Sequence, residues 1–261
     1  MDPQESPVIR VGCAGWSVSK EHAARFPEEG SHLERYAGRF PAVEINSSFY
    51  RPHRPATYTR WAASAPLGFR FAVKVPREIT HGHRLADPEE ALDRFLGECG
   101  ALEDALGPLL VQLPPSLAFD GAVAASFFAA LRERFAGDVV CEPRHPSWFR
   151  PEAQQVLVGH QVARVAADPP AVPSAAQPGG WGGLVYYRLH GAPRVYYSAY
   201  SEAYLAALAT TLREAARSAP VWCIFDNTAE GAATDDALAV MERLGAESIS
   251  RALSPEMPPE C

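Results

Sequence analysis

The chain has 261 residues, of which 47% are hydrophobic, and its formal net charge at pH 7 is −7. This length suits one large α/β domain or two small ones, and no apolar run approaches the roughly 20 residues that a membrane helix needs. The acidic balance counts against a general nucleic-acid binder, which usually carries a basic excess. Because the segment Met1–Pro7 is polar and acidic rather than a signal peptide, we expect a cytoplasmic protein.

The cysteines and lysines limit the kinds of site that the chain can contain. Five cysteines without a C-x-x-C pair argue against a disulfide framework and against a cysteine-based zinc site. Lys20 and Lys74 are the only lysines, and every other basic residue counted as lysine or arginine is an arginine. A lysine at a strand end in such a chain indicates a need for an amine there, with chance as the alternative.

Short apolar segments recur along the chain, each followed by a turn or a helical stretch. The eight predicted strands are Val8–Gly12, Ala42–Ile45, Phe69–Val75, Leu109–Leu113, Asp138–Glu142, Val162–Ala166, Leu184–Leu189 and Val221–Phe225. Most are apolar on both faces, as expected of parallel strands covered by helices. The predicted helices are Leu33–Arg39, Thr57–Ala65, Glu89–Leu106, Ala122–Phe135, Pro151–His160, Ser201–Arg217 and Thr234–Leu244.

The order of these elements predicts the fold. Alternating strands and helices indicate a parallel sheet, and eight such units in this length predict a single (β/α)₈ TIM barrel rather than an open doubly wound sheet. The segment Pro169–Gly183 shows no helix, so we expect the unit between the sixth and seventh strands to be irregular. Without a repeat or a linker, residues 1–261 are predicted to be one domain, with Ser254–Cys261 as a loose tail.

Polar residues stand at the C-terminal end of every predicted strand, where barrel enzymes build their sites. In chain order they are Trp16, Glu44, Asn46, Lys74, Gln112, Glu142, Arg144, His145, Asp168, Arg188, His190, Asp226 and Asn227. Because side chains alternate along a strand, residues two apart, such as Arg188 and His190, share a face. The alternative interpretation is a structural ion-pair network that fills the top of the barrel.

Several of these strand ends lie in motifs that point to one family. The motifs follow one another along nearly the whole chain: Gly12–Ser17, Val43–Tyr50, Phe69–Lys74, Ile79–His81, Gln112–Pro115, Glu142–Trp148, Arg188–Gly191 and Phe225–Thr228. They resemble the YecE-like family, the domain of unknown function 72. The resemblance implies a TIM-barrel fold and a set of site residues, but no reaction, because the family has no established activity. This chain has Asp226 where the family usually has Asn, Pro143 where an aromatic is common, and Ser48 in place of a usual Thr.

Acid and base groups are prominent among the predicted site residues. Glu142 is expected to act as the general base and His190 as the general acid. Glu44 and Asp168 are further acid–base candidates. Lys74 is the candidate for a Schiff base with a carbonyl substrate, if its pKa is lowered.

The other site residues are expected to bind the substrate. A cationic clamp for phosphate or carboxylate is predicted from Lys74, Arg144 and Arg188. Flat apolar faces for a sugar or a base are expected from Trp16, Tyr50 and Trp148. The remaining predicted binding residues are Asn46, Gln112, His145, Asp226 and Asn227.

We expect no resident cofactor, with a divalent metal as the alternative. Glu44, Glu142, Asp168 and His190 could supply ligands for such a metal. No H-E-x-x-H spacing supports a metal site, and the nearby cationic groups argue against a further cation.

The sequence therefore predicts an enzyme that uses acid–base chemistry on a small anionic or sugar-like substrate, by hydrolysis or by a lyase or isomerase step. One alternative is a nucleic-acid-binding protein or metal-dependent nuclease, with phosphate contacts from Arg51, Arg54, Arg77 and Arg84. The other alternative is a non-catalytic protein that binds a small anion.

Overall fold

The structure is a computed structural model that describes residues 8–252, with side chains described as far as residue 245. The predicted tail Ser254–Cys261 lies outside the described residues, as does the segment Met1–Pro7. Within the described part, no helix combines the length and the apolar character needed to cross a membrane.

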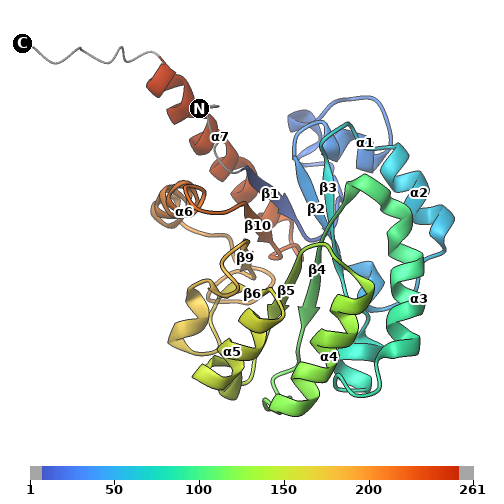
Figure 1. The fold of residues 1–261 in the computed structure, drawn as a ribbon. Coiled ribbons are helices and arrows are strands. Elements are labelled where there is room, and N and C mark those ends of the chain that lie inside the picture. Colours follow the sequence, from blue (N-terminus) through green and yellow to red (C-terminus); the bar gives the residue numbers. More distant parts are fainter. Residues whose placement is uncertain (1–7, 253–261) are drawn as a thin grey trace, which may run out of the picture.

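Two sheets form the centre of the molecule, and helices cover their outer sides (Figure 1). One sheet has the order β1-β10-β9-β7 and is built from Ile9–Cys13 (β1), Val221–Phe225 (β10), Val185–Leu189 (β9) and Ala166–Asp168 (β7). The other has the order β2-β3-β4-β5-β6-β8 and is built from Ala42–Ile45 (β2), Arg70–Lys74 (β3), Leu106–Gln112 (β4), Val139–Glu142 (β5), Val162–Arg164 (β6) and Gly179–Gly180 (β8). Paired strands run parallel, except that β8 is antiparallel to β6.

Helices alternate with the strands along the chain, as predicted. The α-helices are His32–Ala37 (α1), Pro55–Ala63 (α2), Glu89–Cys99 (α3), Gly121–Arg134 (α4), Pro151–Gly159 (α5), Glu202–Ala215 (α6) and Ala232–Ala252 (α7). Shorter helical turns are Ala23–Arg25 (η1), Ser47–Phe49 (η2), Glu78–Gly82 (η3), Gly100–Ala105 (η4), Pro146–Phe149 (η5) and Pro173–Ala176 (η6). Local signals fix several starts: Ser31 and Glu34 form a capping box at α1, and the Asp120 side chain accepts backbone N–H groups at α4.

Both sheets contribute side chains to one apolar interior. Its buried members are Ala42, Ala72, Leu110, Val140, Ala163, Val165, Leu184, Tyr186, Trp222 and Ile224. Because side chains alternate along a strand, the residue two positions after each member points to the same side. In six strands (β2, β3, β4, β5, β9 and β10) that residue is polar or charged and lies at the strand end. The fold thus places a polar layer directly beyond the apolar interior.

The mixed α/β fold with parallel strands is confirmed, whereas a closed eight-stranded barrel is not. Between β1 and β2, the described pairing is a single bridge of Ala14 with Glu44, beside a 2.9 Å hydrogen bond from the Gly15 N–H to the Glu44 carbonyl. On the opposite side, the predicted sixth strand divides at Val165, so that β6 belongs to one sheet and β7 to the other. β6 pairs with β5 and β8, and β7 pairs with β9, so neither strand joins the two sheets.

The chain between β7 and β9 has no α-helix, as predicted for this irregular unit. It forms the turn η6 and the two-residue strand β8, and the Trp181 N–H donates to the Val162 carbonyl at 2.8 Å. These contacts hold the second half of the segment along β6.

Candidate functional site

Seven charged side chains gather at the C-terminal ends of the strands, directly beyond the apolar interior. We call this set the charged layer: Glu44, Lys74, Glu142, Arg144, Arg188, His190 and Asp226. All but Arg144 are buried, and none of the buried six is more than 5% exposed. Because a buried charge is costly without a partner, the pairing within the layer decides which groups are available for chemistry.

Arg188 lies at the centre of the layer and contacts all three carboxylates. Its Nη2 and Nε donate to Glu44 at 2.7 and 3.0 Å, and the Tyr186 hydroxyl donates to the same carboxylate at 3.0 Å. Its Nη1 donates to Glu142 at 2.9 Å, and its Nη2 lies 3.0 Å from Asp226 Oδ2. Burial opposes the charged guanidinium, but the carboxylates outweigh burial and hold the pKa of Arg188 well above its ordinary value. Arg188 is therefore a permanent cation.

His190 bridges two of these carboxylates. Its Nε2 lies 3.0 Å from Glu142 Oε1, and its Nδ1 lies 3.0 Å from Asp226 Oδ2. A neutral imidazole has one donor and would turn a lone pair toward one carboxylate, whereas the imidazolium donates to both. Burial acts to lower the pKa of His190, but Glu142 and Asp226 outweigh it, and the pKa is raised. The two contacts therefore fit the imidazolium form of His190.

Glu142 accepts charged donors on both of its oxygens. Arg144 Nη2 and Nε donate to Oε1 at 2.9 and 3.2 Å, alongside the His190 contact, while Arg188 donates to Oε2. Burial acts to raise the pKa of Glu142, but these three cations outweigh it and hold the pKa well below its usual range. A carboxylate with its lone pairs engaged in this way is a weak base.

The charged layer is balanced without its lysine. Its three carboxylates face two guanidinium groups and one imidazolium, so a protonated Lys74 adds a positive charge with no counterpart. Burial, together with repulsion by Arg188, lowers the pKa of Lys74 to about 8, although the nearby carboxylates oppose the shift. The sequence places the only buried lysine of the chain at this point.

The Lys74 amine has few contacts with other side chains. Its side chain makes no hydrogen bond or ion pair with any residue that the structure describes, and its Nζ lies 4.1 Å from the centre of the Phe49 ring. The backbone at this position is fixed more firmly, because the Ser48 hydroxyl donates to the Lys74 carbonyl at 2.7 Å. The backbone of Lys74 is therefore held in place, while its amine has no hydrogen-bonding or ion-pair partner among the described residues.

Arg144 marks the open side of the layer. Its side chain is 25% exposed, and Tyr196 lies close enough to it to hydrogen-bond. Arg144 Nη2 also lies 3.3 Å from His190 Nε2, and both groups donate to the same oxygen of Glu142. A substrate that reaches the layer would therefore meet Arg144.

Two of the predicted amide residues lie at the same strand ends. Gln112 is 7% exposed, and its Nε2 donates to the Leu113 carbonyl at 3.0 Å. Asn46 has a buried Oδ1 with no hydrogen-bond partner among the described residues. Both remain candidates for binding.

Asp168 and Asn227 are not brought into the layer. Ala166 packs in the core between the sheets and the helices, so Asp168, two residues later, shares the helix-facing side of β7. There the Asp168 carboxylate accepts a hydrogen bond from the Tyr200 hydroxyl at 2.9 Å. Asn227 turns toward α7, where its Nδ2 donates to Asp236 at 2.7 Å. The alternation that brings Arg188 and His190 together thus places these two residues on other sides.

Three of the aromatic and imidazole side chains that were predicted to bind substrate lie outside the charged layer. Trp16 packs edge-on against Trp61 at a centroid distance of 5.0 Å. Trp148 is 1% exposed and donates its indole N–H to a backbone carbonyl at 2.9 Å, and the His145 ring caps η5. Tyr50 is the exception, because it is 73% exposed and lines a cavity described below.

Two residues of the site were missing from the sequence interpretation. Tyr186 stands two positions before Arg188, and the alternation rule that paired Arg188 with His190 could have found it. Phe49 has no comparable signal, because it lies in the turn η2, where the sequence does not define the direction of a side chain.

The described side chains contain no cluster of ligands suited to a divalent metal. Among residues 8–245, no group of three or more His, Cys, Asp or Glu side chains is arranged to hold a metal ion. The carboxylates of the charged layer instead contact its arginines and its imidazolium.

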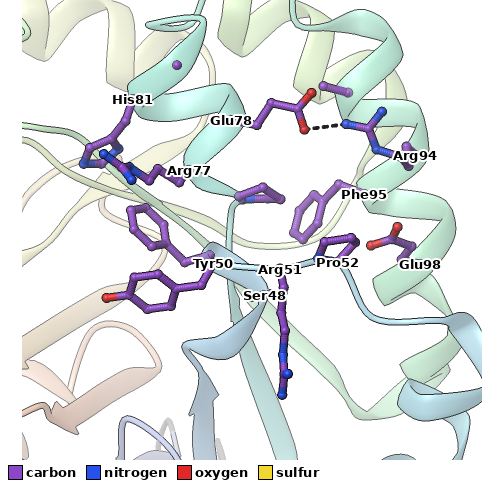
Figure 2. A pocket seen from close by; sticks show the side chains of 14 residues that line it. Ser48, Tyr50, Arg51, Pro52, Arg77, Glu78, His81, Arg94, Phe95 and Glu98 are labelled. Atoms are coloured by element: carbon purple, nitrogen blue, oxygen red, sulfur yellow. Dashed lines mark hydrogen bonds and ion pairs between the residues drawn. The ribbon is translucent and has the colours of Figure 1, made fainter.

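A cavity of about 510 Å³ opens beside the charged layer, between the loop after β2, the turn η3 and helix α3 (Figure 2). We call it the side cavity. Phe49 lines this cavity, and the same ring covers the Lys74 amine. Phe49 therefore forms the wall between the side cavity and Lys74.

Comparisons with known proteins define the relationships of this chain. The family model described as "Protein of unknown function DUF72" matches residues 10–260. UPF0759 protein YecE of Escherichia coli (strain K12) is 32% identical over 152 residues, which cover 58% of this chain and 54% of that protein. UPF0759 protein YunF of Bacillus subtilis (strain 168) is 28% identical over 156 residues, which cover 55% and 53% of the two chains. The chain thus spans about half the length of these curated relatives.

Solved structures show the same fold. A DUF72 family protein of Enterococcus faecalis V583 is similar with a TM-score of 0.77 at 24% identity, covering 97% of this chain and 100% of that one. A DUF72 family protein of Thermotoga maritima MSB8 is similar with a TM-score of 0.75 at 26% identity, covering 91% and 99%. None of these names states an activity.

Proposed function

We propose that this chain, which belongs to the DUF72 family as its motifs indicate, is an enzyme that acts on a small anionic substrate and uses Lys74 as its acid–base group. The proposal keeps the acid–base chemistry expected at the strand ends and moves the central role from Glu142 to Lys74. The two sheets would then form an incompletely closed (β/α)₈ barrel, a fold in which enzymes place their sites at the C-terminal strand ends.

The observation that carries this proposal is the unpaired Lys74 amine within an otherwise balanced set of charges. A group whose pKa lies near the working pH is the most effective proton acceptor and donor. Glu142 and His190 fit that role less well, because each is already engaged with partners on both sides. In this proposal they act as positioning residues that hold Arg144 and Arg188.

The same charge balance supports an anionic substrate. When Lys74 takes up a proton, the layer gains a positive charge that a carboxylate or phosphate group would neutralise. Arg144 lies on the open side, where it could contact such a group. A bound anion would then favour the protonated amine and assist proton transfer from the substrate to Nζ.

Proton transfer at Lys74 suits a lyase or isomerase step, in which the neutral amine removes a proton from carbon or oxygen of the substrate. The rival role for the same amine is a Schiff base with a carbonyl substrate. Borohydride reduction distinguishes the two, because only the Schiff base leaves the substrate covalently attached to the Lys74 peptide.

The experiment is a turnover screen of small carboxylates and phosphates with the wild type and with Lys74→Met, Lys74→Arg and the matched control Lys20→Arg. We expect both Lys74 variants to lose about 10²- to 10⁴-fold in rate, the usual contribution of a general base or acid. The control should keep wild-type activity, because Lys20 is exposed. Wild-type activity should rise with pH through about 8. Retained activity in Lys74→Arg would contradict the proposal, since arginine keeps the charge but does not release the proton.

The second candidate is non-catalytic binding of a small anion, favoured by the same surplus charge on protonated Lys74. In that case the wild type would bind anions without turnover, and Lys74→Arg would bind them equally well. A nucleic-acid partner is a third candidate, because Arg51, Arg54, Arg77 and Arg84 are all exposed. Binding of DNA or RNA that weakens steeply with salt would favour it.

A further inference from the structure

The side cavity has two ends of different character (Figure 2). Arg77 and His81 lie next to each other at one end, close to Tyr50. Phe95 and Pro52 lie toward the other end and present apolar surface there, with the Glu98 carboxylate beside them and the Arg94–Glu78 ion pair nearby. A ligand that fills the cavity would therefore carry a polar group at one end and an apolar body at the other.

The charges along the cavity wall leave Arg77 unpaired. Arg94 pairs with Glu78 at 2.5 Å, as Figure 2 shows. The Arg51 side chain points away from this pair in the same view. The Arg77 side chain has neither a hydrogen bond nor an ion pair with any residue in the described part of the chain, and Arg77 is exposed. Its guanidinium is therefore free to bind an anion, for which arginine offers a planar pair of donors.

His81 provides a second polar group at the same end. The Thr80 hydroxyl lies 2.9 Å from His81 Nδ1, which fixes the ring, and the ring stands edge-on to Phe49 at a centroid distance of 5.0 Å. Burial and the neighbouring cations Lys74 and Arg77 lower the pKa of His81, so the ring is neutral at neutral pH. His81 therefore offers an anion an uncharged polar ring beside the Arg77 guanidinium.

We propose that the side cavity binds an organic anion with an apolar body, whose anionic group lies between Arg77 and His81 and whose body packs against Phe95 and Pro52. A volume of about 510 Å³ lies within the range of small-molecule sites. The apolar body distinguishes this ligand from an inorganic anion. A role for this anion as the substrate of Lys74 rests on the proposed function, whereas binding of the anion in the side cavity is independent of it.

Phe49 gives the proposal its link to the charged layer. Its ring is 7% exposed and touches the side cavity on one side and the Lys74 amine on the other. An anion held by Arg77 and His81 thus lies at the end of the cavity nearest the lysine, and rotation of Phe49 would open the cavity toward the Lys74 amine. The part of the ligand next to its anionic group would then reach the Lys74 amine.

The experiment uses three matched probes and isothermal titration calorimetry. Naphthalene-2-sulfonate carries both an anion and an apolar body, 2-naphthylmethanol carries the body alone, and inorganic sulfate carries the anion alone. We expect the first to bind the wild type at least tenfold more tightly than either of the others. Arg77→Gln should weaken it about tenfold or more, because a charge-assisted contact is lost. Arg39→Gln, at an exposed arginine outside the cavity, is the matched control and should leave binding unchanged.

Two results would overturn the inference. One is equal affinity in Arg77→Gln and Arg39→Gln, or no preference for naphthalene-2-sulfonate over sulfate. The other is loss of binding in Lys74→Met, because the anion would then be held by the lysine itself. Binding that persists in Lys74→Met supports the cavity site even if the turnover screen fails, so the two proposals are tested separately.

Discussion

Replacing Lys74 by methionine should make the protein more stable at pH 7. Methionine keeps most of the length of the side chain and removes a buried charge that has no hydrogen bond or ion pair with any described residue. The folded protein holds the pKa of Lys74 at about 8, against an ordinary value of 10.5. At about 1.4 kcal/mol for each pKa unit, protonated Lys74 lowers the free energy of unfolding by up to about 3.5 kcal/mol. We expect Lys74→Met to recover about 1–3 kcal/mol in urea unfolding.

The pH dependence of this gain has a defined sign. Between about pH 8 and 10.5, the folded wild type has lost the Lys74 proton while the unfolded chain still binds it, so wild-type stability rises with pH. The advantage of Lys74→Met should therefore be complete below pH 8 and nearly absent by pH 10.5. Lys20→Met, at an exposed lysine, should change little at either pH. A Lys74→Met protein that is less stable than the wild type at pH 7, or whose advantage does not change with pH, would refute the reasoning.

Three further substitutions test the charged layer. Arg188→Met leaves the carboxylates of the layer without their central cation and should cost about 3–5 kcal/mol in urea unfolding; a loss below about 1 kcal/mol would show that these groups are not held as described. Tyr186→Phe removes a hydrogen bond to a buried carboxylate and should cost about 2 kcal/mol, and no loss would mean that Glu44 has enough donors without it. His190→Asn should destabilise most at low pH, because a raised pKa contributes stability that is complete below about 6.5 and is lost as the pH rises through the folded value. Thermal unfolding from pH 5.5 to 9 measures this difference, and a constant offset would contradict it.

The strand ends were the part of the site that the sequence could predict. Alternation along a parallel strand depends only on local geometry, so Glu44, Lys74, Glu142, Arg188 and Asp226 could be assigned to one layer from their positions alone. The same rule fails for Asp168, because the chain leaves one sheet and enters the other at Val165. Nothing in the residues around Val165 signals that change.

The roles within the layer could not be predicted, because they depend on which charges pair. From sequence, Glu142 is as suitable a base as any carboxylate, and only the contacts from Arg144, Arg188 and His190 show it to be engaged. The closed barrel is not confirmed for a related reason, since the number of strands does not determine whether the first and second strands pair along their length. Phe49 and the side cavity depend on turns whose side-chain directions are set by tertiary packing.

The pKa of Lys74 is the most direct test of the central claim. Because Lys20 and Lys74 are the only lysines, protein labelled with ¹³C-lysine gives two Cε signals, and Lys20→Arg identifies that of Lys74. We predict that the Lys74 signal titrates near pH 8, about 2.5 units below the ordinary lysine value of 10.5. A Lys74 signal that titrates above pH 10, in the ordinary range of lysine, would show a fully charged amine and would contradict the assignment of Lys74 as the acid–base group.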